Sequence, residues 1–277
     1  PRITNLELLS FNKPLIKWVG GKTQILKEVL SIFPKKMNNY HEPFIGGGSV
    51  LLGLLTCKQN GLVDIHGKIY AYDLNKELIA MYKNIQSNAL ELYEEINKLI
   101  QDINKIEKEK QDNGRKKDIP ENIEEALKTK ESYYYWIRNC YNKLKEKTSI
   151  KASAMFIFLN KTCFRGLYRI GPKGFNVPYG NYKNPEIINK QHLLDIQLLI
   201  KDVVFTYMDY KESMDNIEIN DFVYLDPPYA PEKIDSFVAY TSEGFGLSHH
   251  LDLFERCNYL FSKFLMSNSN VDLVKDN

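Results

Sequence analysis

Short apolar runs and helically spaced apolar positions alternate at both ends of the chain. Residues 75–86 place Leu78, Ile79, Tyr82 and Ile85 on one helical face, and residues 247–264 show a similar spacing. Buried strands are predicted for the apolar segments 66–75, 203–210, 221–229 and 264–269. Strands that alternate with helices predict an α/β fold built on a doubly wound sheet.

The middle of the chain has a different pattern. In residues 91–100 Leu92, Ile96, Leu99 and Ile100 share one helical face, whereas residues 105–122 carry mixed charges and predict an exposed loop between helices. The pattern therefore predicts a discontinuous α/β domain from residues 1–86 and 195–277, interrupted by a mainly helical domain at 87–194. A strand at 264–269 would leave an exposed sheet edge, so we expect the native fold to continue beyond Asn277.

Composition narrows the class of protein. The 277 residues are 43% hydrophobic and 26% charged, which is ordinary for a globular protein. The sequence contains no apolar run near the roughly 18 residues of a membrane helix and no signal-peptide pattern at its start. The four cysteines form no C-x-x-C pair, so we expect no metal site and a reducing, cytoplasmic location.

A glycine-rich turn follows a predicted strand at FIGGGSVLLGLL (44–55). Gly46 and Gly48 would let a ligand approach the backbone closely. A dinucleotide fingerprint starting at Gly46 would need glycine at position 51, which is leucine, and no G-K-[ST] follows at the spacing of a phosphate loop. The turn therefore predicts a nucleoside-like ligand. Asp73 ends the next strand, where an acidic residue usually accepts hydrogen bonds from ribose.

The tetrapeptide Asp226-Pro227-Pro228-Tyr229 follows the apolar run FVYL. The prolines stop the strand and stiffen the loop, and Asp226 falls at the sheet edge where α/β ligands bind. An aromatic amine is a poor nucleophile, but a carboxylate and a rigid carbonyl that accept its two hydrogens would favour attack on a methyl donor. The ring of Tyr229 offers a stacking face to the target base.

The segment KWVGGK (17–22) supplies two further ligand contacts. Trp18 offers a ring face to a cation or to adenine, and Lys22 offers a charge to a carboxylate. S-adenosylmethionine carries a sulfonium, an adenine, a ribose and a carboxylate. Together with the glycine turn and Asp73, these residues could contact each of those groups.

These motifs resemble the Dam-type (D12 class) family of DNA adenine-N6 methyltransferases over about residues 13–269. The match rests on KWVGGK, EPFIGGGS, YDLN, DPPY and residues 159–185, in that order. The resemblance implies a Rossmann-like S-adenosylmethionine-dependent sheet with a mainly helical target-recognition insertion that carries a β-hairpin. It implies that Asp226, Pro227, Pro228 and Tyr229 hold a flipped adenine, and that the cofactor is bound by Trp18, Lys22, Phe44, Gly46, Gly48, Asp73 and Asp226.

Residues 151–190 differ in charge from the rest of the chain. They hold seven basic residues and one acidic residue, a net charge of +6, although the whole chain carries only +2. Basic side chains neutralise phosphates, arginine can read guanine, and interleaved aromatic rings can fill the gap left by a flipped base. By resemblance, Arg169 and Lys17 read the outer base pairs, Phe164 wedges into the base stack, and the DNA contacts are Lys17, Phe164, Arg165, Leu167, Arg169, Pro178 and Tyr182.

The recognition site and the substrate leave alternatives open. Family members that read GATC commonly have Asn where this chain has Arg165, so the predicted site is GATC or CATG. Two alternatives stay open: a methyltransferase that acts on RNA or another amine, and a non-catalytic DNA-binding relative. A cytosine-C5 methyltransferase is disfavoured because the sequence has no Pro-Cys nucleophile. The expected partners are double-stranded DNA and a possible cognate restriction endonuclease, with no membrane, and the chain is expected to be a monomer or weak dimer.

Overall fold

Two compact units make up the protein. The computed structural model describes residues 1–110, 119–230, 245–270 and 272–276. One unit, called the sheet unit here, joins Pro1–Phe11, Lys22–Asn75 and Asp202–Asn277. The other, called the helical unit, joins Asn12–Gly21 and Lys76–Lys201. The catalytic role predicted for 1–86 plus 195–277, and the recognition role predicted for 87–194, stay predictions.

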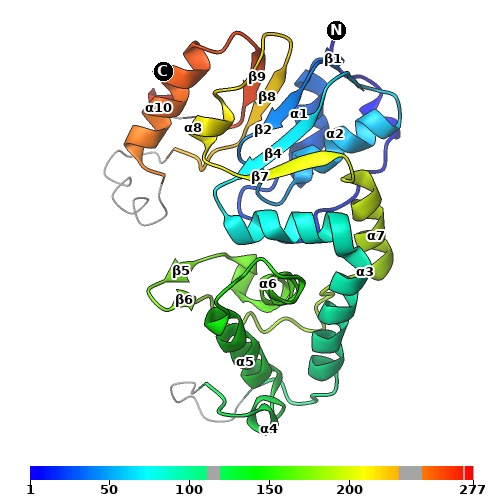
Figure 1. Cartoon of the computed structure of the whole chain (residues 1–277), viewed down its shortest axis with the longest axis vertical. Helices are drawn as coiled ribbons and strands as arrows, with labels where there is room; N and C mark the ends of the chain where they lie inside the picture. The colour runs from blue at the N-terminus through cyan, green and yellow to red at the C-terminus, as the bar shows by residue number, and fades with distance from the viewer. Residues whose placement is uncertain (111–118, 231–244, 271, 277) are drawn as a thin grey trace. The chain divides into compact units, whose positions relative to one another are not determined.

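A five-stranded parallel sheet forms the centre of the sheet unit (Figure 1). Tyr40 pairs with Ile69 on one side and with Phe222 on the other, so the central strand is β2. The carboxyl ends of all five strands therefore meet at one edge of the sheet. In order across the sheet, the strands are β7 (Val203–Tyr207), β4 (Ile69–Asp73), β2 (Tyr40–Glu42), β8 (Phe222–Leu225) and β9 (Lys263–Met266).

The two faces of the sheet are covered by different helices. Alternate residues of β8 point to opposite faces, so Phe222 and Tyr224 contact Phe33 at the end of α1, while Val223 and Leu225 join the apolar cluster of α8 and α10. The helices and minor elements of this unit are η1 (Leu6–Leu8), η2 (Thr23–Ile25), α1 (Leu26–Ile32), β1 (Lys36–Met37), α2 (Ser49–Gln59), β3 (Asp64–Ile65), α8 (Tyr210–Ser213), α10 (Leu247–Asn258) and α11 (Asp272–Asp276).

A buried polar cluster fixes β2 beside the start of β8. His41 Nε2 lies 2.9 Å from Asp221 Oδ2, and the Asp221 carboxylate also accepts the backbone N–H groups of Asn39 and Glu218. Burial lowers the pKa of His41, so the neutral ring donates to Asp221. Burial acts to raise the pKa of Asp221, but these hydrogen bonds hold it below its ordinary value. The cluster therefore aligns β2 with the start of β8.

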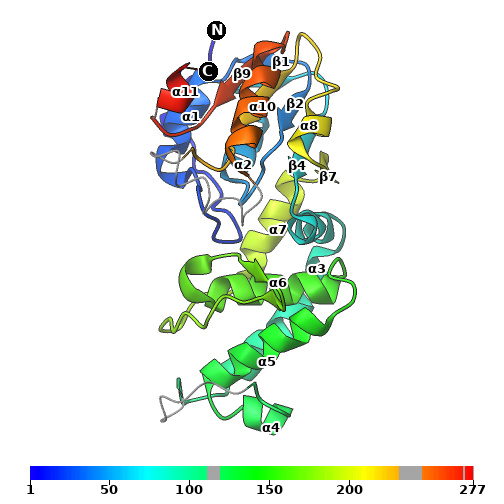
Figure 2. The same ribbon diagram turned by 90° about the vertical axis from the view of Figure 1, so that its left-hand side faces the viewer.

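Packed helices form the helical unit, with α6 (Ile150–Thr162) in contact with both α3 (Lys76–Asn104) and α5 (Lys130–Lys143) (Figure 2). The helix α3 bends at Asn88, whose φ of −145° is not helical. Side-chain oxygens of Thr129 and Ser149 accept the backbone N–H groups that α5 and α6 leave unpaired at their starts. The remaining elements are α4 (Ile123–Ala126), η3 (Phe164–Gly166), β5 (Ile170–Gly171), β6 (Gly174–Phe175) and α7 (Lys190–Leu199).

Most predicted elements agree with the observed ones, but two predictions run too far. The helical spacing of residues 247–264 passes the end of α10 at Asn258, because the apolar residues after it lead into β9, and the strand predicted at 203–210 ends at Tyr207, after which Tyr210 begins α8. The mixed α/β fold with a parallel sheet is confirmed, and β5 and β6 form the expected antiparallel hairpin. The expected loop between helices is observed on both sides of residues 111–118, which lie outside the described part of the chain. The strand predicted at 264–269 is β9, and in the described sheet it occupies an edge beside β8.

Candidate functional site

The glycine turn is tied to the end of β4 at the carboxyl edge of the sheet. The backbone N–H of Gly46 donates to Asp73 Oδ2 at 3.0 Å, and that of Asn75 donates to Asp73 Oδ1 at 3.0 Å. Gly48 has φ of +79° where α2 begins, a conformation that residues with a Cβ rarely adopt. Burial raises the pKa of Asp73 against these hydrogen bonds. The backbone of the glycine turn and the Asp73 carboxylate therefore lie side by side at the carboxyl edge of the sheet.

A partly buried ion pair forms at the end of β8, where Asp226 begins the tetrapeptide. Lys22 Nζ lies 2.8 Å from Asp226 Oδ2, and the Lys22 side chain is only 4% exposed. The Lys22 backbone N–H donates to Ser49 Oγ at 3.0 Å, which ties the lysine to the start of α2. Burial raises the pKa of Asp226, and Lys22 opposes that rise. Sequence reasoning assigned Lys22 to a ligand carboxylate, whereas here its ammonium pairs with Asp226.

The loop that follows Asp226 is held by the chain after β9. Ala230 donates its N–H to Asn268 Oδ1 at 3.1 Å and accepts a hydrogen bond from Ser269 Oγ. Pro227 and Pro228 restrict the backbone between these anchors. The ring of Tyr229 is 37% exposed and its centre lies 4.9 Å from Lys22 Nζ. The tetrapeptide therefore carries fixed carbonyl groups beside one accessible aromatic ring.

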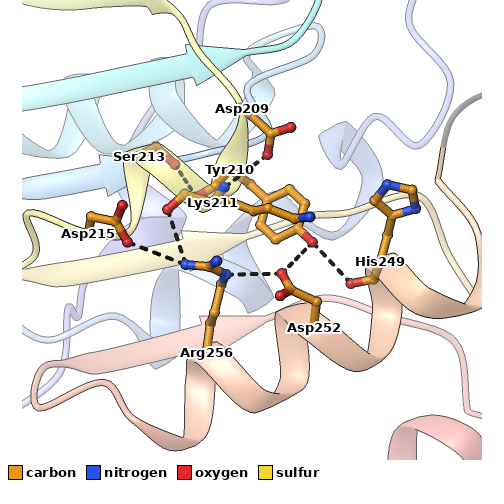
Figure 3. A network of polar contacts seen from close by, with 8 residues as sticks. All are labelled: Asp209, Tyr210, Lys211, Ser213, Asp215, His249, Asp252 and Arg256. Carbon is orange, nitrogen blue, oxygen red and sulfur yellow. Dashed lines mark hydrogen bonds and ion pairs between the residues drawn. The ribbon is translucent and has the colours of Figure 1, made fainter.

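An aromatic and polar network lies where β7 ends (Figure 3). The Tyr210 ring stacks on Phe44 with centroids 5.5 Å apart. Its hydroxyl donates to Asp252 of α10 at 2.7 Å, and Arg256 Nε donates to the same carboxylate at 2.9 Å. Asp209 accepts the Lys211 backbone N–H at 3.0 Å and so caps α8. Phe44 is a predicted cofactor contact, whereas nothing in the sequence pattern indicates that Tyr210 stacks on it.

In the helical unit, the side chain of Asn160 holds the backbone of Lys17. Its N–H donates to Asn160 Oδ1 at 2.9 Å, and Asn160 Nδ2 donates back to the Lys17 carbonyl at 2.7 Å. Lys17 Nζ lies 4.1 Å from the centre of the Tyr182 ring. Gly166 has φ of +62°, and a Cβ there would stand 2.5 Å from Lys17 Cβ. Nothing in the sequence had indicated that Asn160 holds Lys17.

The turn around η3 presents Phe164 and Arg165. Phe164 donates its N–H to the Pro178 carbonyl at 2.8 Å, its ring is 42% exposed, and Leu167 donates its N–H to the Phe164 carbonyl at 3.2 Å. Arg165 has φ of +55°, and its guanidinium carbon lies 5.0 Å from the Phe164 ring centre. The turn holds an apolar ring and a cation side by side at the surface.

Arg169 is braced across the hairpin. Its Nε donates to Asn176 Oδ1 at 2.6 Å and its guanidinium also donates to the Asn176 carbonyl at 3.2 Å. These two bonds orient the guanidinium plane. All seven residues predicted to contact DNA thus lie in the helical unit, on the segment 12–21, in η3 or between η3 and α7.

Comparison with known proteins identifies the family. A family model described as D12 class N6 adenine-specific DNA methyltransferase matches residues 18–277. The chain belongs to this family. The type II methyltransferase M.MjaIII of Methanocaldococcus jannaschii is 36% identical over 272 residues, covering 94% of this chain and 86% of that protein. The DNA adenine methylase of Salmonella typhi is 27% identical over 270 residues, covering 96% and 84%.

This D12-class chain is therefore an adenine-specific DNA methyltransferase, and S-adenosylmethionine is its methyl donor. The sheet unit fits that donor, because its carboxyl edge combines the glycine turn, Asp73 and the Phe44–Tyr210 stack. When bound, S-adenosylmethionine supplies an electrophilic methyl group. Of the predicted contacts, the sheet unit contains Lys22, Phe44, Gly46, Gly48, Asp73 and Asp226.

Trp18 belongs to the helical unit of this methyltransferase. Its ring stacks on Tyr168 with centroids 5.6 Å apart and lies 6.4 Å from Phe156. Its assignment to the cofactor stays a prediction. Among the residues that the structure describes, no group of three or more His, Cys, Asp or Glu could hold a metal ion. No helix in the described ranges has both the length and the apolar character needed to cross a membrane.

Proposed function

We propose that this methyltransferase modifies N6 of an adenine within a four-base palindromic site of duplex DNA, GATC or CATG, after the adenine has flipped out of the helix. The observation that carries the proposal is the Asp226 carboxylate at the sheet edge, paired with buried Lys22 and followed by two prolines and an accessible tyrosine ring. A base inside a duplex cannot reach a carboxylate that is only 19% exposed without leaving the stack.

The chemistry of the tetrapeptide suits a poorly nucleophilic amine. Lys22 holds Asp226 Oδ2, which leaves Oδ1 of the same carboxylate to accept one N6 hydrogen. The Pro227 carbonyl, on a stiff backbone, is suited to accept the other. Both bonds strengthen as positive charge develops on N6 in the transition state, which is preorganised electrostatic stabilisation. The ring of Tyr229 would stack on the base and fix its plane.

The helical unit supports duplex DNA as the substrate. The exposed Phe164 ring beside Arg165 suits a wedge that fills the space of a departed base, and braced Arg169 suits bidentate reading of guanine. Lys17, held at its backbone by Asn160, offers a further cation. We also propose that a cognate restriction endonuclease acts on the same site and that the chain works as a monomer or weak dimer.

The recognition site is tested by methylating a random duplex library and sequencing the modified positions. We expect every modified adenine to lie within one palindrome, GATC or CATG. The matched variant is Arg165→Asn, because related enzymes that read GATC commonly have asparagine there; the distribution of modified sites should change. Modification at random positions would contradict the proposed site. Modification within one palindrome, with an unchanged distribution in Arg165→Asn, would contradict a role of Arg165 in choosing the site.

Base flipping and substrate class need separate measurements. A duplex with 2-aminopurine at the target position should gain fluorescence on binding, and the Phe164→Ala variant should give a smaller gain. Competition between the duplex and structured RNA for labelled methyl transfer separates DNA from RNA as substrate. Stronger inhibition by RNA than by unlabelled duplex would favour the alternative of an RNA methyltransferase.

A further inference from the structure

Glu42 is a buried acid that no step of the proposed reaction uses. It is the last residue of β2 and is 2% exposed. Because Tyr40 pairs with Phe222 in parallel register, Glu42 shares a sheet face with Tyr224 and lies beside the end of β8, from which Asp226 projects. Glu42 and Asp226 therefore lie close enough for the charge of Asp226 to act on Glu42.

The groups facing Glu42 come from three parts of the sheet unit. From its own strand, the Tyr40 hydroxyl donates to Glu42 Oε2 at 2.7 Å. On β8, burial and then the negative charges of Asp226 and Glu42 raise the pKa of Tyr224, whose hydroxyl is hydrogen-bonded to Ser267 Oγ at 2.6 Å. Among described residues, the charged groups that act on Glu42 are Lys22 and Asp226.

The protonation state of Glu42 follows from this arrangement. The buried Glu42 and the partly buried Asp226 share the influence of one ammonium, and a second, unpaired carboxylate would be costly there. Lys22 Nζ contacts Asp226 at 2.8 Å, so Asp226 keeps the negative charge and Glu42 keeps its proton. Burial, with help from the Asp226 charge, raises the pKa of Glu42 to about 8, although Tyr40 and Lys22 oppose the rise.

We propose that Glu42 is a positioning residue of the methyl-transfer site, because its neutral carboxyl leaves Lys22 paired with Asp226 and the loss of its proton sets the alkaline limit of activity. The inference rests on the proposed role of Asp226. Once Glu42 is ionised, two carboxylates compete for Lys22. The Asp226 carboxylate is then displaced from the geometry in which it accepts the N6 hydrogen, and the methyl-transfer rate falls.

The two tyrosines that face Glu42 do not titrate in the same range. Burial raises the pKa of Tyr40 and of Tyr224 well above ordinary tyrosine values, so both hydroxyls keep their protons at mildly alkaline pH. Burial raises the pKa of Asp226, and Lys22, whose ammonium lies 2.8 Å away, opposes that rise and favours the charged carboxylate. An alkaline limb near pH 8 therefore points to Glu42.

The test compares the single-turnover rate of methyl transfer between pH 6.5 and 9.5 in wild type and Glu42→Gln, with each profile scaled to its own value at pH 7. The wild-type rate should fall about tenfold for each pH unit above about pH 8, as a single ionisation requires, and Glu42→Gln should lack this limb. The control Glu28→Gln makes the same chemical change at an exposed position and should keep the wild-type profile.

A second variant decides the matter if Glu42→Gln does not fold. Tyr40→Phe removes the hydrogen bond that lowers the pKa of Glu42, so the alkaline limb should move to higher pH. A purely structural role for Glu42 would change the rate or the stability without moving the limb. If the wild type is active, any one of three results overturns the role of Glu42 alone: the wild type shows no alkaline limb, the limb persists in Glu42→Gln, or the limb does not move in Tyr40→Phe. A wild type that forms no N6-methyladenine at any pH overturns the proposed function as well.

Discussion

Removing Lys22 should destabilise the protein more than removing the carboxylate it pairs with. Lys22→Met leaves the Asp226 carboxylate in a site where its side chain is only 19% exposed. Asp226→Asn leaves the ammonium, but it also removes the charge that helps keep Glu42 protonated. Glu42 can then ionise and pair with Lys22. In Asp226→Asn the ammonium therefore gains a substitute carboxylate, whereas in Lys22→Met the Asp226 carboxylate gains no substitute cation from Glu42.

The structure sets the size of the difference. Breaking a buried ion pair from one side costs about 3–5 kcal/mol, and the partial exposure of Asp226 places Lys22→Met near the lower end, at about 3 kcal/mol. With Glu42 as a substitute, Asp226→Asn should cost only about 1 kcal/mol, the net value of a typical hydrogen bond. The double variant Lys22→Met/Asp226→Asn should cost at least about 2 kcal/mol less than the sum of the single variants.

Urea unfolding of the wild type and the three variants at pH 8 measures these free energies. The pH dependence has a definite sign. The folded-state pKa of Asp226 is raised above its unfolded value, so its contribution to stability is greatest below the unfolded pKa and is lost as the pH rises through the folded pKa. Without Lys22 that pKa rises further, so the penalty of Lys22→Met should shrink between pH 8 and pH 5. Additive costs within about 0.5 kcal/mol, or a penalty independent of pH, would refute the pairing.

Three further substitutions test other parts of the site. Tyr210→Phe removes the hydroxyl that donates to Asp252, and calorimetry should show S-adenosylmethionine binding weakened by about 1 kcal/mol, or roughly fivefold. Gly166→Ala places a Cβ against Lys17 at positive φ, and denaturant unfolding should show a loss of about 2 kcal/mol. Arg165→Ala should remove about 1–3 kcal/mol of discrimination at one base pair, measured by competition among duplexes with single substitutions.

Each of these has a clear contrary result. Unchanged cofactor affinity in Tyr210→Phe would show that the network of Figure 3 supports α10 and not the cofactor site. Wild-type stability in Gly166→Ala would mean that the turn relaxes away from Lys17. Uniformly weaker binding to every duplex in Arg165→Ala would assign that side chain to the phosphate backbone and not to a base.

Sequence patterns predicted the sheet well because its strands are short and apolar, and two of them lead into Asp73 and Asp226. Asp73 and Asp226 could be placed at one edge because parallel strands in such a fold share their carboxyl ends. The kink of α3 at Asn88 left no signal, since an asparagine inside a helical pattern predicts no particular bend. Helix existence was therefore predictable, and helix shape was not.

Single site residues could be predicted from their local motifs. Contacts between residues far apart in the sequence could not. Lys22 and Asp226 lie 204 positions apart, and nothing local indicates that they pair. Glu42 was passed over because an acid before a proline and a glycine turn has no distinctive spacing. Its burial beside Tyr40 appears only once β2 and β8 are aligned. The support that Asn160 gives Lys17 is hidden for the same reason.

The central claim is that Asp226 is the residue on which methyl transfer to adenine depends. The most direct measurement incubates wild type and Asp226→Ala with duplex DNA and labelled S-adenosylmethionine, and quantifies N6-methyladenine after digestion of the DNA. We predict that the variant binds the duplex with near wild-type affinity but forms almost no N6-methyladenine. Undiminished transfer by Asp226→Ala, or a label found on a base other than adenine, would contradict the account.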